Sequence, residues 1–471
     1  MACHGECLQK SAGVDLKTAA QRMPALQPGI MRRRACSVRE TLPHDGNTFR
    51  LRLALLAAAA LTLAACSSSG PIDSTPPPRA PGPFDKALVL RGARLAAIGN
   101  CITCHTAPQG RAYAGGYAVH TPFGTVYGTN ITPDPDTGIG RWSEAAFVRA
   151  MREGVDREGR HLYPAFPYEY FTRLSDDDLH ALYAFVMTRE PANATPPANQ
   201  IFVPRPAVAL WKARYFKPER FQADPSRPAG WNRGAYLAES LAHCSACHTP
   251  RDALGAEKKD QYLAGGEVGA WHAPALDASS PSPIPWTAAA LAAYLHTGLV
   301  DEHAMTAGPM RPVVMNLSQV SEEDRRAIAE YIVSIDTRAP REREARKQAA
   351  LAHAPLRPAA GTDDRAVRNG AAIYAGACGD CHDRGRAAEG GALRLPLAIG
   401  LTIPTPRNLI HIVRDGIVPG VHDTRPWMPD FRGALTDDEL ADLLTYLRSL
   451  TDRPPWRDVD AEVKRASKGA G

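Results

Sequence analysis

The chain has 471 residues, which is long enough for two to four domains that each bury a core of their own. Its formal net charge of +5 resides in residues 1–65, because residues 66–471 hold 46 basic and 46 acidic side chains. A body without net charge argues against a nucleic-acid partner. The 41 prolines indicate several extended linkers.

Residues 1–65 have the pattern of an export leader. Two arginines precede an apolar run at 53–63, which suits a signal sequence and is too short to span a bilayer. The run leads into Leu-Ala-Ala-Cys66, which resembles the bacterial lipoprotein cleavage box and implies that Cys66 carries a lipid; ordinary signal cleavage beside an unrelated cysteine is the alternative. The first 30 residues lack export character and suggest a start codon placed too early. We therefore expect a lipoprotein on the periplasmic side of a bacterial membrane, with a flexible linker at 66–84.

Three copies of Cys-x-x-Cys-His follow, reading CITCH at 101–105, CSACH at 244–248 and CGDCH at 378–382. They hold all six cysteines that lie beyond Cys66, so no cysteine is left over for a disulfide. The copies are 143 and 134 residues apart, and this spacing indicates three domains in tandem.

The same five residues suit a zinc site, a redox dithiol or a covalently attached haem. Zinc needs four ligands, and no second ligand pair accompanies each copy. A dithiol gives no reason for the histidine. Two cysteines on one helical turn can form thioethers to one porphyrin while the adjacent histidine reaches its iron. We therefore predict three covalently bound haem c groups, attached to Cys101, Cys104, Cys244, Cys247, Cys378 and Cys381, with His105, His248 and His382 as iron ligands.

Helical patterns flank each motif. A glycine-bearing helix precedes every copy, and a capped helix closes every domain. We expect N-caps at Ser175, Ser321 and Thr436, each with an acidic residue three positions later, and middle helices that end near Gly154, Gly298 and Gly416. The prediction is an all-α fold of three cytochrome domains at 85–190, 229–337 and 363–452, joined by Pro-rich linkers at 191–228 and 338–362 and followed by a tail at 453–471.

The ligand opposite each histidine differs between the copies. Met310 in GPM and Met428 in PWMP occupy matching loops before the last helix, so we predict that they bind iron. The first domain has Phe166 in that loop, and phenylalanine cannot bind iron.

Met151 is the preferred substitute in the first domain, although it aligns in the repeat with Leu295 and Val413, which suggests a packing role. His161 and His120 are further candidates. An open sixth position, which would bind a small molecule, is the remaining alternative.

Four stretches carry a family resemblance: NITPDPDTGIGRWSEAAF (130–147), WNRGAYLAESLAHCSACHTPRDALG (231–255), AGPMRPVV (307–314) and MPDFRGALTDDELADLLTYLR (428–448). From about residue 85 to 452 the chain resembles the triple-haem cytochrome c subunit of bacterial membrane-associated dehydrogenases that oxidise alcohols, gluconate, sorbitol or aldehydes. The resemblance implies class I cytochrome c domains. Many members carry methionine where Phe166 stands, and YPAFPY with LYAFVMTREP resembles the branch paired with molybdenum hydroxylases.

The resemblance implies an electron-transfer subunit without catalytic residues of its own. Its partner would be a dehydrogenase catalytic subunit with a molybdopterin, flavin or quinone cofactor, and its acceptor a quinone, another cytochrome or a terminal oxidase. One rival is a haem enzyme that reduces peroxide or another small oxidant at the first haem. Another is a membrane tether, for which Cys66→Ala would abolish assembly of the complex.

The two linkers carry different expectations. The segment 191–230 mixes aromatic and basic residues, and we expect an ordered, extended strap across the second domain rather than a docking site for a partner. The segment from 338 is rich in alanine and charge, and we expect a short exposed helix without chemistry.

Overall fold

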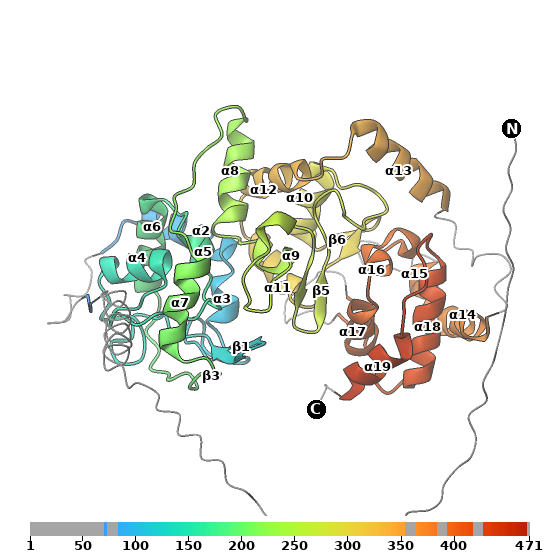
Figure 1. The fold of residues 1–471 in the computed structure, drawn as a ribbon, viewed down its shortest axis with the longest axis horizontal. Coiled ribbons are helices and arrows are strands. Elements are labelled where there is room, and N and C mark those ends of the chain that lie inside the picture. Colours follow the sequence, from blue (N-terminus) through green and yellow to red (C-terminus); the bar gives the residue numbers. More distant parts are fainter. Residues whose placement is uncertain (1–69, 73–82, 354–363, 384–392, 418–426, 469–471) are drawn as a thin grey trace, which may run out of the picture. The chain divides into compact units, whose positions relative to one another are not determined.

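The computed structural model describes residues 70–72, 83–353, 364–383, 393–417 and 427–468 (Figure 1). The expectations for the leader, for the lipid on Cys66 and for most of the 66–84 linker therefore lie outside the described residues. In the described part of the chain, no helix combines the length and the apolar character needed to cross a membrane.

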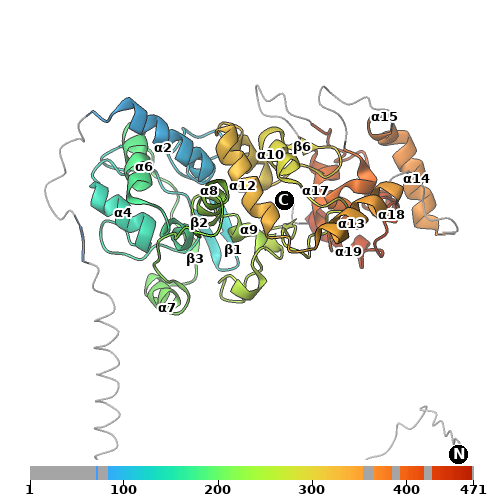
Figure 2. The same ribbon diagram turned by 90° about the horizontal axis from the view of Figure 1, so that it is seen from above.

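Helices dominate, and they form three similar sets, each with a first, a middle and a last helix. The first set consists of α2 (Lys86–Ile98), α4 (Glu144–Glu153) and α6 (Asp176–Met187). The second consists of α8 (Ala229–Glu239), α10 (Ala288–Thr297) and α12 (Glu322–Ser334), and the third of α14 (Arg365–Ala377), α17 (Arg407–Asp415) and α18 (Asp437–Ser449). In every set the first helix packs on the last, and α14 and α18 lie side by side in Figures 1 and 2.

A glycine lies at each of these helix crossings. A Cβ on Gly92 would lie 2.0 Å from the carbonyl oxygen of Ala181, and one on Gly234 would lie 1.9 Å from that of Ala327. On Gly370 the corresponding distance to the carbonyl oxygen of Asp442 is 2.2 Å. The first and last helices can approach this closely only because these residues have no side chain.

The predicted N-caps are confirmed. The side chains of Ser175, Ser321 and Thr436 each accept a hydrogen bond from the backbone N–H three residues later, at 3.2 Å. Only Thr436 forms a complete capping box, because Glu439 accepts from the Thr436 N–H in return.

In the first two sets the acidic residue at that third position pairs with an arginine instead. Arg91 donates to Asp178, and Arg233 donates to Asp324. Each arginine directly precedes the crossing glycine, so the ion pair joins the first helix to the last at their crossing point.

The predicted ends of the middle helices are also confirmed. Gly154, Gly298 and Gly416 follow α4, α10 and α17, with φ angles of 60°, 80° and 67°. These left-handed values favour glycine and turn the chain out of the helix. Gly154 and Gly298 adopt the left-handed helical conformation, whereas Gly416 combines its positive φ with a ψ of −174°, so its loop leaves the helix in a different direction.

The all-α prediction describes the packed core and omits small antiparallel sheets in the loops. One sheet joins β1 (Ala118–Thr121), β2 (Gly124–Tyr127) and β3 (Gln200–Ile201). Two hairpins pair β4 (Gly266–Val268) with β5 (Trp271–Ala273), and β6 (Leu299–Val300) with β7 (Ala304–Met305). Because these strands have two to four residues, sequence alternation gives them little signal.

The expected extended strap across the second domain is wrong for the middle of the first linker. Residues Arg205–Tyr215 form helix α7, with a proline in its first turn. Lys212 of α7 hydrogen-bonds to the Glu153 carbonyl at the end of α4, so the helix lies against the first set, while Trp211 donates to the Leu254 carbonyl at 2.9 Å. The helix expected in the second linker is confirmed as α13 (Pro340–His353).

The remaining elements are short or terminal. The predicted tail contains helix α19 (Val459–Lys468), which packs on α17 and α18 and buries Val463. The others are α3 (Cys101–Cys104), α5 (Tyr168–Phe171), α9 (Ser245–His248), η1 (Lys259–Gln261), α11 (Met310–Leu317), α15 (Gly379–His382), η2 (Leu395–Leu397) and α16 (Ile399–Thr402).

Candidate functional site

Each Cys-x-x-Cys-His motif forms a single helical turn directly after the first helix of its set. These turns are α3, α9 and α15. Residues three apart on a helix lie on the same side, so the two sulfurs of each motif can reach one bound molecule. None of the six motif cysteines forms a disulfide with another described residue.

A backbone carbonyl fixes the imidazole of every motif histidine. Nδ1 lies 2.7 Å from the Thr129 oxygen in His105, 2.7 Å from the Pro274 oxygen in His248 and 3.5 Å from the Leu393 oxygen in His382. A carbonyl only accepts hydrogen bonds, so Nδ1 carries the proton and Nε2 keeps its lone pair for a metal.

The surroundings of the histidines favour the same protonation state. Burial lowers the pKa of His105, His248 and His382 below its ordinary value, and the hydrogen bond to the backbone carbonyl opposes part of this effect. The imidazoles are therefore neutral near pH 7, which is the form that binds iron.

The thiols are not activated as a redox pair would require. Burial, with a smaller contribution from the second cysteine of the motif, raises the pKa of Cys101 and of Cys244 to about 12. The same causes raise the pKa of Cys378 to about 11. Redox-active dithiols have a lowered pKa, so these motifs do not fit thioredoxin-type chemistry.

The second and third motifs line a cavity of about 450 Å³. The wall is mainly apolar, as a hydrophobic prosthetic group requires, and it also includes the two methionines predicted as ligands. From these two sets the structure brings together Cys244, Cys247, His248 and Met310, and Cys378, Cys381, His382 and Met428. The residues in this wall therefore suit covalently attached haem, because each motif offers two cysteine sulfurs and one unprotonated imidazole nitrogen.

Phe166 in the first set occupies the register of these methionines. It follows Gly154 by twelve residues, as Met310 follows Gly298 and Met428 follows Gly416. Its ring is half-buried and contacts the ring of Phe171 edge-on, with 5.5 Å between centroids. The first set thus has an aromatic ring at the position where the other two have a thioether.

The substitute ligands proposed for the first set lie in different surroundings. Met151 is buried in the hydrophobic core on α4, and Leu295 and Val413, its counterparts in the repeat, are buried as well. His161 Nδ1 lies 3.2 Å from the Lys212 ammonium, and His120 Nδ1 lies 3.2 Å from the Thr125 hydroxyl on β2. Met151 as an iron ligand stays a prediction.

Comparison with known families agrees with the motifs. The family model described as "Cytochrome c" matches residues 89–190 and 232–336, and the model described as "Cytochrome C oxidase, cbb3-type, subunit III" matches residues 365–447. Every match contains one Cys-x-x-Cys-His motif. Cytochrome c domains carry haem c covalently, so the chain is a haem protein.

Relatives with curated names lead to the same family. The chain is 33% identical over 419 residues to the fructose dehydrogenase cytochrome subunit of Gluconobacter japonicus, covering 84% of this chain and 85% of the relative. It is 35% identical over 387 residues to the gluconate 2-dehydrogenase cytochrome c subunit of Pantoea cypripedii, covering 77% and 85%.

A third relative, one of the subunits of nicotinate dehydrogenase from Pseudomonas putida, is longer than this chain. It is 44% identical over 399 residues, which are 83% of this chain and 33% of the relative, so the chain spans about a third of that protein. With its motifs, its helix sets and relatives that it matches over most of their length, the chain belongs to the family of cytochrome c subunits of dehydrogenases.

Proposed function

We propose that the chain is an electron-transfer subunit that holds three haem c groups and passes electrons from a dehydrogenase catalytic subunit to a membrane acceptor. The observation that carries this proposal is the repeated imidazole geometry. In all three motifs Nδ1 faces a backbone carbonyl, which leaves the lone pair on Nε2. Three equivalent sites in one chain suit a relay.

The residues of each site have separate tasks in this proposal. The cysteine pairs hold the group in place, and the carbonyl bonds of His105, His248 and His382 orient the iron ligand. Met310 and Met428, which line the cavity, would each provide a thioether as the second protein ligand of an iron. When bound, haem c supplies a one-electron carrier whose potential a thioether ligand raises. The wall around these ligands is mainly apolar.

At the first site, Phe166 is the feature that would support the rival function, reduction of peroxide at an open iron. A phenyl ring that is packed against Phe171 fills space near the site without binding a metal. The fructose and gluconate relatives are named as cytochrome subunits of dehydrogenases, which supports the relay function instead. Low-spin spectra for all three ferric haems would exclude the rival.

We further propose that the catalytic partner contains molybdopterin and oxidises an N-heteroaromatic compound or an aldehyde. The support is the 44% identity to the nicotinate dehydrogenase relative, against 33% and 35% for the fructose and gluconate relatives. The YPAFPY loop supports the same branch. In this proposal Cys66 carries a lipid that holds the complex at the periplasmic face of a membrane, and a quinone, a cytochrome or an oxidase accepts the electrons.

The test begins with the native complex. A C-terminal tag would be used to purify the chain from gently solubilised membranes, and mass spectrometry would identify the bound proteins and the haem mass on each motif peptide. We expect three modified peptides, a large molybdopterin protein and reduction of the haem bands by nicotinate but not by fructose or gluconate. Motif peptides without haem would contradict the relay, and a flavin or quinoprotein partner would contradict the proposed branch.

A further inference from the structure

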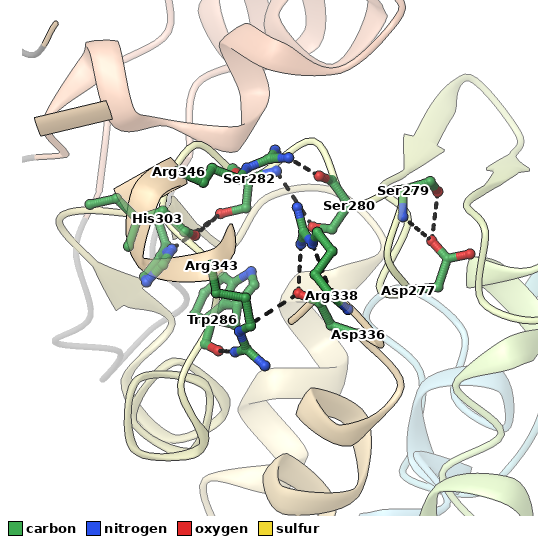
Figure 3. Close-up of polar contacts among 11 residues, drawn as sticks. Asp277, Ser279, Ser280, Ser282, Trp286, His303, Asp336, Arg338, Arg343 and Arg346 are labelled. Atoms are coloured by element: carbon green, nitrogen blue, oxygen red, sulfur yellow. Dashed lines mark hydrogen bonds and ion pairs between the residues drawn. The ribbon is translucent and has the colours of Figure 1, made fainter. Parts of the chain in front are cut away.

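Arg338 begins the second linker, for which the sequence predicts no chemistry, and it lies between α12 and α13. Its side chain is only 7% exposed and forms a two-pronged ion pair with Asp336, which is 8% exposed. Nη2 lies 2.6 Å from Oδ2, and Nε lies 2.8 Å from Oδ1. Figure 3 shows the two side chains facing each other.

The remaining nitrogen of this guanidinium is different. Nη1 of Arg338 is buried and has no hydrogen-bond partner among the described residues. Arg338 and Asp336 both line the cavity whose wall contains the second and third motifs, and both follow directly on α12 of the second set. A buried, charged donor without an acceptor is costly, so its position in the wall of a ligand cavity indicates an acceptor on the ligand.

The neighbouring arginines show that this is not a general property of the linker. Arg343 donates to the Trp286 carbonyl at 2.5 Å, and Arg346 donates to the Ser280 and Ser282 carbonyls at 2.9 and 2.7 Å (Figure 3). Both thereby fasten α13 to the loop at 280–286. Neither lines the cavity, whereas Arg338 does.

Haem brings two propionate carboxylates as its anionic groups, and a guanidinium is the side chain best suited to bind a carboxylate. We propose that Arg338 donates from Nη1 to a propionate of the haem c attached to Cys244 and Cys247, with Asp336 fixing the plane of the guanidinium. This inference rests on the proposed function. It makes the linker part of the second haem site, so that haem attachment also positions the start of α13.

The decisive variant is Arg338→Gln, with Arg346→Gln as the matched control, because Arg343 also lies 4.0 Å from Asp336 Oδ2 and is therefore not independent of the pair. The control removes a guanidinium from the same linker, one that does not line the cavity. Both would be made in the full-length holoprotein, with haem content checked by the mass of each motif peptide. The readouts are the midpoint potentials in an optical redox titration and the carboxylate bands in redox difference infrared spectra of protein with ¹³C-labelled haem propionates.

Arg338→Gln leaves a propionate charge without its partner, which favours the ferric state. We expect one of the three potentials to fall by the equivalent of a tenfold change in the redox equilibrium, ~59 mV, and a labelled carboxylate band to move. Arg346→Gln should change neither. If Arg338→Gln fails to fold because buried Asp336 keeps only the longer ion pair with Arg343 at 4.0 Å, the double variant Asp336→Asn with Arg338→Gln removes both charges and should show the same band shift.

Three unchanged potentials and unmoved carboxylate bands, with all haems attached, would overturn the propionate contact and leave Arg338 as a partner of Asp336 only. Absence of haem from the 244–248 peptide of the parent protein would instead contradict the proposed function. The two failures are therefore distinguished by the mass measurement.

Discussion

Two glycines in one helix provide a sharp test of how the helix sets are built. Gly370 and Gly376 both lie in α14. A Cβ on Gly370 would lie 2.2 Å from the Asp442 carbonyl oxygen and 2.6 Å from Tyr446 Cβ, both on α18, whereas a Cβ on Gly376 would meet nothing within 4 Å. Replacing either glycine by alanine therefore gives the same gain in helix propensity. At Gly370 the new methyl group clashes with α18, whereas at Gly376 it meets no other atom.

The magnitudes follow from these distances. Alanine in place of a helical glycine gains ~1 kcal/mol of helix stability. At Gly370 the new methyl group forces α14 away from backbone that cannot rotate aside, and overpacking of this kind costs up to ~3 kcal/mol. We expect a net loss of about 2 kcal/mol for Gly370→Ala and a gain of ~0.5–1 kcal/mol for Gly376→Ala.

Hydrogen–deuterium exchange of the holoprotein, read by mass spectrometry on peptides from α14 and α18, measures this difference locally. A loss of about 2 kcal/mol corresponds to roughly 30-fold faster exchange through opening of the set. Gly376→Ala should slow exchange in the same peptides. Equal protection in the two variants would refute the argument that absence of a side chain at Gly370 holds the crossing together.

Three further outcomes are expected. His248→Ala should leave haem attached through the cysteines but change its optical spectrum, and a spectrum identical to the parent would exclude His248 as an iron ligand. Phe166→Met places a thioether in the register of Met310, so the near-infrared absorption typical of methionine-bound ferric haem should increase; no increase would show that residue 166 does not face the iron. The hydrogen bonds that Glu439 accepts from Thr436 lower the pKa of its carboxyl, so its contribution to stability is present above the unfolded pKa of about 4.3 and disappears as the pH falls through the lowered folded value. Glu439→Gln should therefore be less stable than the parent at pH 7 in denaturant titrations and match it in acid, and a difference that persists in acid would contradict this reasoning.

The features that the sequence predicted are those with local causes. The caps at Ser175, Ser321 and Thr436 and the helix ends at Gly154 and Gly298 depend on residues within a few positions, so the pattern alone indicates them. The threefold repeat then locates the corresponding helices in each set. Nothing local, however, reveals that the glycines of the first helices meet backbone of the last ones.

The linkers were harder to predict because tertiary contacts decide their structure. Proline on both sides of 205–215 favoured an extended strap, yet the segment inside is free of proline after its first turn and forms α7. Lys212 secures this helix through the Glu153 carbonyl, an acceptor that only the folded first set presents. The charge-rich second linker has the pattern of a solvated helix, and only burial distinguishes Arg338 from its neighbours.

The three candidate haem sites have the same arrangement of helices but differ at single residues outside the Cys-x-x-Cys-His motif. In the first, Phe166 stands twelve residues after the glycine that ends the middle helix, where the other sets have methionine, and in the second, a linker arginine lines the cavity. Iron potential responds to the axial ligand and to charge near the porphyrin, so in the proposed relay both changes would act on the potentials that order electron flow. A repeat that keeps a histidine–carbonyl contact in each site while varying these positions would, in the proposed relay, give each haem its own potential.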